Sequence, residues 1–368
     1  MLQFLSKIVG QGNVVSILEK FINTSSIPHA ILFAGKRGVG KYNAALQFTK
    51  AINSAIIENQ TIKNKFNQLH EPYVKYIIPL NDAKTEKVLF DNSQKLSKEE
   101  NSIRKKYNQV IEKKIANPYF NLNLTSSSSI RINQIRDIKK FLSVSYPEIP
   151  FRSIIIDHAD LMTEEAQNSL LKNLEEPPEG IIFILLTSKI DKIFSTIKSR
   201  CQIINFDLLK DNDLSNILIE NFQANKDNIK LILEFAEGSV FNAVQFIDYD
   251  IKNKHQEILN LLRFIATNKF EEAVRYFEKE EKDIESILLT FSLIKLWFND
   301  CAKIKNGYSN IYFKEFEINI RNFIIKYSKT DFYKMDESLS RIIDSISKNI
   351  NLTLLYLHAI FEIKQLSN

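Results

Sequence analysis

The chain has 368 residues, of which 44% are hydrophobic and 25% are charged, and its net charge is +5. This length predicts two or three domains, and the composition is that of a globular protein that can bury a core. With only two cysteines, Cys201 and Cys301, a disulfide framework and a cysteine-rich zinc site are excluded. We see no secretory pattern and no run of about 18 apolar residues that would span a membrane, so we expect a cytoplasmic protein.

The first half of the chain alternates short apolar runs with helical patterns. The apolar runs are "AILFA" at 30–34, "SIIIDHA" at 153–159 and "GIIFILLTS" at 180–188, and the helical patterns lie at 41–52 and 164–176. Continuous apolar runs of this kind are typical of buried parallel strands. We therefore predict an α/β domain, with a parallel sheet and flanking helices, over residues 1–205.

Residues 57–118 interrupt this pattern. They contain "YVKYIIPL", which has the composition of a strand, and then a long polar segment with helical character. Because connections within α/β cores are usually short, a segment of this length predicts an insertion on the surface.

The second half is poor in the residues that break helices. All prolines lie at or before Pro178, and only Gly238 and Gly307 follow Gly180. Long helices with few tight turns are expected there. We predict a small helical domain at 206–250 and an all-helical domain at 251–368.

The stretch "GKRGVGKY", residues 35–42, follows the first predicted strand and precedes a helical pattern, as a phosphate-binding loop does. Gly35, Gly38 and Gly40 would let backbone N–H groups face phosphates, and Lys41 would reach the β and γ phosphates. A glycine turn followed by a surface lysine is the alternative. Tyr42 stands where such loops have the Ser or Thr hydroxyl that binds Mg²⁺, so the metal site is incomplete.

A second acidic element follows the predicted strand at 153–159. Asp157 occupies the place of the aspartate that helps to position Mg²⁺ in phosphate-loop enzymes, and its neighbour is His158 where hydrolysing enzymes of this architecture have a glutamate. A histidine can accept a proton in principle. Together with Tyr42, however, the change favours His158 as a loop residue and predicts a site without turnover.

Several motifs resemble those of the AAA+ clamp-loader family. They are "IVGQ" (8–11), "IPHAILFAG" (27–35), "SIRINQIRDIKKFL" (129–142), "LLKNLEEPP" (170–178), "FILLTS" (183–188) and "SRC" (199–201). The resemblance covers most of residues 1–250. It implies an AAA+ phosphate-loop domain, then a helical lid at 206–250 and a C-terminal collar at 251–368 that binds other subunits.

Within that family the chain is similar to the type of subunit that does not hydrolyse ATP. The resemblance implies that Arg200, between Ser199 and Cys201, is an arginine finger that acts in trans on the nucleotide of a neighbouring subunit. A local ion pair is the alternative role for this arginine. Where hydrolysing relatives have an arginine in "GS-x-R-x-A", this chain has Phe241 in "EGSVFNAV".

The resemblance also implies partners and cofactors. The partners are the gamma/tau and delta subunits of the clamp loader of DNA polymerase III, and through that complex the sliding clamp and primer–template DNA. No catalysis by this chain alone and no required cofactor are expected, although the degenerate loop leaves ATP or ADP binding open. No zinc is expected, because residues 57–118 lack the four cysteines that many members carry there. An active AAA+ ATPase and a DNA-binding module of another kind are the alternatives.

Overall fold

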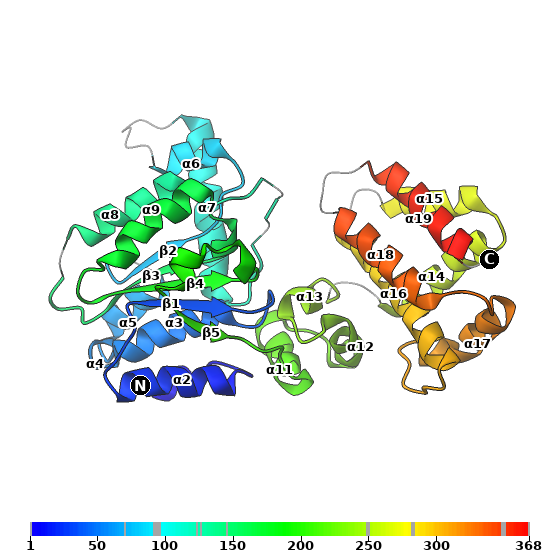
Figure 1. The fold of residues 1–368 in the computed structure, drawn as a ribbon, viewed down its shortest axis with the longest axis horizontal. Helices are drawn as coiled ribbons and strands as arrows, with labels where there is room; N and C mark the ends of the chain where they lie inside the picture. The colour runs from blue at the N-terminus through cyan, green and yellow to red at the C-terminus, as the bar shows by residue number, and fades with distance from the viewer. Residues whose placement is uncertain are drawn as a thin grey trace. The chain divides into compact units, whose positions relative to one another are not determined.

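The computed structural model describes residues 2–69, 71–90, 97–122, 124–125, 127–144, 146–247, 251–280, 284–346 and 351–366. The chain forms two compact units (Figure 1). The first unit comprises Met1–Ala224 and Ala236–Asn242, and the second comprises Asn225–Phe235 and Ala243–Asn368.

The first unit is built on a parallel sheet, which within the described residues has five strands in the order β2-β3-β4-β1-β5. The strands are β1 (Ala30–Ala34), β2 (Val74–Ile77), β3 (Arg152–Ile156), β4 (Ile181–Thr187) and β5 (Gln202–Asn205). The predicted α/β class with a parallel sheet is confirmed. β3 ends earlier than the predicted strand because His158 adopts a left-handed backbone conformation, with φ of 53°, and begins a turn.

Helices cover both faces of this sheet. The helices of the first unit in the described residues are α1 (Leu2–Leu5), α2 (Gly12–Asn23), α3 (Lys41–Ile52), α4 (Ser54–Ile57), α5 (Gln60–Asn67), α6 (Ala83–Phe90), α7 (Lys98–Ala116), α8 (Ile132–Leu142), α9 (Glu164–Glu175), α10 (Ser195–Lys198) and α11 (Asp211–Phe222), with 3-10 turns η1 (Ala159–Leu161) and η2 (Ile190–Lys192).

Alternate residues of each central strand enter different cores. Ile31 and Phe33 of β1 pack with residues of α2 and α3, whereas Leu32 packs with residues of α8 and α9 on the opposite face (Figure 1). Because successive side chains of a strand point to opposite faces, a strand covered on both sides is apolar throughout. This explains the continuous apolar runs in the sequence.

The segment 57–118 is only in part the surface insertion that we predicted. β2 lies at the edge of the sheet and pairs in parallel with β3, and Phe66 of α5 is fully buried. The last turn of α7 contains Lys114, whose side chain is also buried. The segment therefore supplies part of the domain core and, as described below, part of the candidate site.

All the regular elements in the described residues of the second unit are helices, as the scarcity of glycine and proline predicted. α12 (Lys226–Ala236) and α13 (Val240–Val244) lie where the chain passes between the units, and the later elements are α14 (Ile251–Ala266), α15 (Phe270–Glu280), α16 (Ile284–Lys305), η3 (Lys314–Phe316), α17 (Glu317–Lys326), α18 (Phe332–Ile346) and α19 (Leu352–Leu366). Phe277 stacks on Phe291 and on Tyr356 in its core. None of the helices in the described residues is long and apolar enough to span a bilayer.

Candidate functional site

The glycine-rich loop joins β1 to the start of α3, as the sequence predicted. Gly38 and Gly40 have φ values of 77° and 90°, a backbone region that glycine adopts without the steric cost of a side chain. The N–H of Gly35 donates to the carbonyl of Thr187 at 3.2 Å, which ties the loop to the end of β4. The loop thus has the strand–loop–helix setting of a phosphate-binding site.

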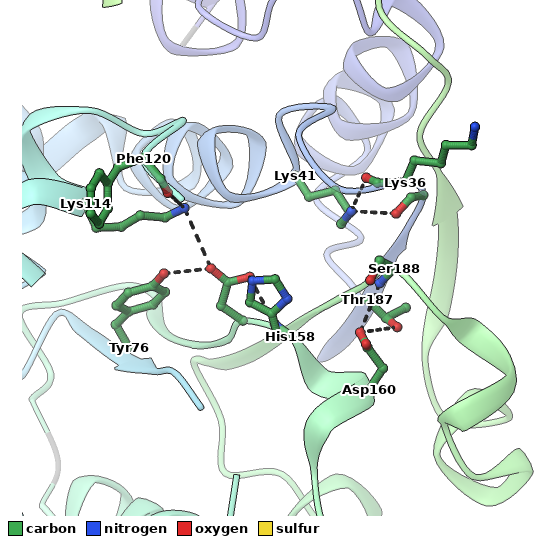
Figure 2. Close-up of polar contacts among 11 residues, drawn as sticks. Lys36, Lys41, Tyr76, Lys114, Phe120, His158, Asp160, Thr187 and Ser188 are labelled. Carbon is green, nitrogen blue, oxygen red and sulfur yellow. Dashed lines mark hydrogen bonds and ion pairs between the residues drawn. The ribbon is translucent and has the colours of Figure 1, made fainter. Parts of the chain in front are cut away.

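Lys41 is engaged by the loop itself. Its Nζ donates to the carbonyl oxygens of Gly35 and Lys36, at 2.6 and 2.7 Å (Figure 2). Burial of the ammonium group lowers the pKa of Lys41 to about 8, even though the charges of Asp157 and Asp160 act in the opposite direction. The lysine therefore stabilises the loop and does not project from it as a surface lysine would.

The stretch from Ser239 to Phe241 covers the loop from outside. Ser239 Oγ donates to the carbonyl of Arg37 at 2.7 Å, and the N–H of Val240 donates to the carbonyl of Gly38 at 3.1 Å. The Arg37 guanidinium carbon lies 3.9 Å from the centroid of the Phe241 ring, a cation–π contact. Phe241, predicted as the residue that replaces a sensor arginine, is used here to hold the loop.

Little space is left at the loop for a ligand. The cavity there measures about 60 Å³, far below the roughly 300–1,000 Å³ of typical small-molecule sites. Gly38, Gly40, Lys41 and Asp157, four of the predicted site residues, line it together. Its other lining residues are Arg37, Tyr42, Lys114, Pro118, Tyr119, Phe120, Asn121, Leu122, His158, Leu186, Thr187 and Ser188.

Tyr42 fills part of that space. Its ring is buried, and its hydroxyl has no hydrogen-bond partner among the described residues. Burial, together with the nearby charge of Asp157, raises the pKa of Tyr42 well above its ordinary value, so the phenol stays protonated. A neutral phenol packed in this way does not supply the metal-binding hydroxyl that a Ser or Thr would.

Asp157 is held by two side chains from the segment 57–118. Tyr76 OH donates to Asp157 Oδ2 at 2.7 Å, and Lys114 Nζ lies 3.9 Å from the same oxygen (Figure 2). Burial acts to raise the pKa of Asp157, but His158 when it is protonated, the Lys114 charge and the Tyr76 hydrogen bond outweigh it and leave this pKa below its ordinary value. Asp157 is therefore ionised, and the chain supplies its counter-charge.

His158 has the features of a loop residue. Its N–H donates to Asp157 Oδ1 at 3.0 Å, and its Nε2 lies 4.0 Å from the same atom. Burial lowers the pKa of His158 and outweighs the attraction of the Asp157 charge, so the ring is neutral at pH 7.

Asp160 joins the ends of β3 and β4. Its Oδ1 accepts hydrogen bonds from Thr187 Oγ1 at 2.9 Å and from the N–H of Ser188 at 3.0 Å (Figure 2). This buried contact fixes the carboxyl ends of β3 and β4, beside which the candidate site lies.

The sequence reasoning missed Tyr76, Lys114 and Asp160. Lys114 and Tyr76 lie in the segment that we assigned to the surface, and a lysine in a polar helical stretch gives no sign that it is buried. Asp160 was visible in the sequence as the second acid of "DHAD", directly after a strand end.

The Ser199–Cys201 stretch lies away from this cavity, between α10 and β5. Arg200 Nη2 forms an ion pair with Glu175 Oε1 at 2.9 Å, and Nη1 donates to the carbonyl of Thr196 at 2.9 Å. The Arg200 side chain is 34% exposed. Burial raises the pKa of the Cys201 thiol to about 12, so it stays protonated, and Ser199 is exposed.

The residues at the loop do not fit a bound magnesium ion. Asp157 already accepts from Tyr76 and faces the ammonium of Lys114, and Tyr42 contributes no ligand. In the part of the chain that the structure describes, no three His, Cys, Asp or Glu side chains are grouped so that they could hold a metal. We therefore assign no step to a metal in this chain.

Comparison with known proteins places this geometry in a family. The family model described as "DNA polymerase III, delta subunit" matches residues 10–210, which include the loop, Asp157 and Arg200. The tau subunit of DNA polymerase III from Bacillus subtilis is 28% identical over 254 residues, which are 68% of this chain and 38% of that protein. The gamma subunit from Buchnera aphidicola subsp. Schizaphis graminum is 26% identical over 252 residues, 67% of this chain and 58% of the relative.

A replication factor C small subunit from Sulfolobus acidocaldarius is 27% identical over 250 residues, which are 66% of this chain and 58% of that protein. The chain thus matches between 38% and 58% of the length of these three relatives. The family model spans more than half of the chain, and its region holds the whole parallel sheet. The chain therefore belongs to the DNA polymerase III delta-subunit family, a family of AAA+ clamp-loader proteins.

Proposed function

We propose that the chain is a non-hydrolysing, delta-prime-type subunit of a bacterial DNA polymerase III clamp loader. In this role it completes the loader and supplies Arg200 to the nucleotide of a neighbouring gamma/tau subunit, so that the sliding clamp is loaded onto primed DNA. The observation that carries the proposal is the nucleotide site of this chain, which is filled by its own side chains.

Three features of that site argue against turnover. The cavity of about 60 Å³ is too small for a nucleoside triphosphate. Tyr42 replaces the metal-binding hydroxyl, and Phe241 is used to hold Arg37. Since hydrolysis depends on a positioned metal and on cationic groups at the phosphates, the loss of the metal-binding hydroxyl and of the sensor arginine predicts a chain without ATPase activity.

Arg200 has the exposure and the freedom that a finger needs. It is held by a partly exposed ion pair with Glu175, and pairs of this kind stabilise a fold by only about 0–1 kcal/mol. The guanidinium can therefore leave Glu175 for a phosphate at small cost. A guanidinium beside the transferred phosphoryl group stabilises transition-state charge and is worth about 10³–10⁵ in rate in other nucleotidases.

The helical remainder is proposed to serve assembly, with a lid at 206–250 and a collar at 251–368. α17 exposes Ile318 and Ile325, and α19 exposes Leu354 and Phe361, so both helices present apolar side chains that a partner can bury. Gamma/tau and delta subunits are the proposed partners, and the clamp and primer–template DNA are reached through the complex.

ATP turnover by the purified chain tests the first half of the proposal. We expect no hydrolysis above background with Mg²⁺ and ATP. Hydrolysis that disappears in a Lys41→Ala variant would show an active ATPase and overturn the proposal. A contaminating enzyme is recognised because its activity survives that substitution.

The second half is tested in a loader reconstituted with gamma/tau and delta. Arg200→Ala is expected to lower the ATPase rate at the adjacent site by at least about 100-fold, and Arg200→Lys to restore little of it, since lysine lacks the planar fork of donors. Glu175→Gln is the matched control. It removes the ion pair and leaves the guanidinium, so it should keep the rate near that of the parent.

If Arg200 served only to pair with Glu175, the two substitutions would have equal effects on the rate and on stability. That result, with an assembled complex, would reject the finger. The mass of the complex is measured separately, so that failure to assemble is not mistaken for loss of the Arg200 finger.

A further inference from the structure

Lys114 approaches the glycine-rich loop from the segment 57–118, which we predicted to lie on the surface. It lies in the last turn of α7 (Lys98–Ala116), and its Nζ donates to the carbonyl of Phe120 at 3.0 Å, in the chain that turns back after the helix (Figure 2). The turn is fixed by Asn117, whose Oδ1 accepts from the N–H of Tyr119 at 2.9 Å. The lysine is therefore directed inward by the backbone around it.

The ammonium group faces one anion and one aromatic ring. Nζ lies 3.9 Å from Asp157 Oδ2 and 4.5 Å from the centroid of the Tyr42 ring. Each side chain of the Lys114–Asp157 pair is only 9% exposed. Two charges removed from water to this degree persist only when each compensates the other and hydrogen bonds satisfy the rest.

A divalent cation and this ammonium group compete for the same carboxylate. Asp157 Oδ2 already accepts from Tyr76, and its Oδ1 accepts from the N–H of His158. A metal bound to Asp157 would meet the positive charge of Lys114 a few ångströms away, and like charges at that distance in a dry site repel strongly. Lys41 does not take the place of Lys114 beside Asp157, because its Nζ donates to the carbonyl oxygens of Gly35 and Lys36.

We propose that Lys114 is a built-in replacement for the divalent metal, supplying from α7 the positive charge that Asp157 would otherwise take from a bound ion. Tyr42 then replaces the hydroxyl ligand with a ring against which the ammonium packs. The degenerate loop keeps its fold without nucleotide or metal, because its counter-ion is part of the chain. This inference rests on the same non-hydrolysing site as the proposed function and goes beyond it.

Mn²⁺ titration of the full chain tests the inference, with electron paramagnetic resonance to count free Mn²⁺ and thermal unfolding to detect stabilisation. The parent is expected to show no Mn²⁺ binding that depends on Asp157. Binding to the parent that disappears in Asp157→Asn would overturn the proposal, because the metal would then bind with Lys114 in place.

Lys114→Ala is expected to convert the site into a weak metal site. Its thermal midpoint should fall below that of the parent and rise again by about 3 °C when free Mn²⁺ reaches about ten times its dissociation constant. The rise should vanish in Lys114→Ala/Asp157→Asn. Lys113→Ala is the matched control, since Lys113 is an exposed lysine one residue away and should produce no metal response. A folded Lys114→Ala without an Asp157-dependent response contradicts the inference.

If Lys114→Ala does not fold, Lys114→Met/Asp157→Asn decides the question. Removing both charges should leave a thermal midpoint above that of Lys114→Met alone and of Asp157→Asn alone, and a midpoint that is not above that of Lys114→Met would show that Lys114 acts only by packing. These measurements use the chain alone, whereas the Arg200 test uses the assembled loader. A metal that binds the parent would therefore refute the internal counter-ion without touching the finger.

Discussion

Gly38→Ala is the sharpest test of how the glycine-rich loop is closed. An alanine Cβ at this position would lie 2.2 Å from the N of Phe241 and 2.7 Å from Ser239 Oγ, distances at which one backbone must move. The φ of 77° is a second obstacle, since side chains other than glycine rarely adopt it. Both obstacles act on the contact between the loop and the stretch from Ser239 to Phe241.

The expected magnitude follows from three contributions. The left-handed backbone costs about 1–2 kcal/mol with a Cβ. The hydrogen bonds from Ser239 to Arg37 and from Val240 to Gly38 are lost when the backbones separate, at about 1 kcal/mol each. Gly38→Ala should therefore lower the free energy of unfolding by about 3–4 kcal/mol, or the thermal midpoint by about 10 °C.

Two matched glycines separate these contributions. Gly40 has φ of 90°, but an added Cβ would meet the Tyr119 ring only at an ordinary 3.5 Å, so Gly40→Ala should cost about 1–2 kcal/mol. Gly12 has no atom within 4 Å of an added Cβ, and Gly12→Ala should lie within about 0.5 kcal/mol of the parent.

Urea unfolding followed by circular dichroism measures the series. The single tryptophan, Trp297, lies in the second unit, so its fluorescence reports that unit and serves as an internal reference. A Gly38→Ala cost no larger than that of Gly40→Ala would refute the claim that the loop is pressed against Phe241.

Three further predictions concern buried polar groups. The pKa of Lys41 is about 8 in the fold against an ordinary 10.5, so the unfolded chain binds more protons between these values and the parent gains stability as the pH rises. The free energy of unfolding of Lys41→Met relative to that of the parent should therefore fall by about 2 kcal/mol from pH 8 to 10, and a pH-independent difference would contradict this. Burial lowers the pKa of His255 to about 4, so the free energy of unfolding of the parent should fall by about 2–3 kcal/mol between pH 6.5 and pH 4. The free energy of unfolding of His255→Phe should fall by less, and Trp297 fluorescence in urea measures both. An equal loss in both proteins would exclude His255 as the cause. Asp160→Ala leaves Thr187 without its buried acceptor and should lower the free energy of unfolding by about 2–3 kcal/mol. Asp160→Asn should lower it by about 1 kcal/mol or less, and thermal unfolding measures both variants. Equal losses would mean that Asp160 stabilises the fold by packing and not by this hydrogen bond.

The sequence predicted the elements whose signal is local. β1 and α3 have the predicted bounds, 30–34 and 41–52, because a strand buried on both faces is apolar at every position and because the glycines mark where the helix begins. β5 gave no comparable signal, since "QIIN" is short and only Ile204 in it is buried. Propensity says little about so short an edge strand.

The sequence predicted the loop residues and Asp157 of the candidate site, and also the groups that the site lacks. Tyr42, His158 and Phe241 are visible as departures from a pattern at fixed positions in the sequence. The side chains that replace the missing groups cannot be recognised in the sequence, because Lys114 and Tyr76 lie far from Asp157 in the chain and meet it only through the tertiary fold. Among the 49 lysines and arginines, nothing in the sequence marks Lys114 as buried.

The way in which the glycine-rich loop is closed also affects how this chain responds to the ratio of ATP to ADP. A counter-ion that is covalently attached has an effective concentration set by geometry, and dilution cannot remove it. A ligand shifts a conformational equilibrium only by its difference in affinity for the two states. If Lys114 replaces the metal as we propose and the cavity of about 60 Å³ admits neither nucleotide, this domain offers ATP and ADP no such difference, and its conformation should be the same at any ratio of the two.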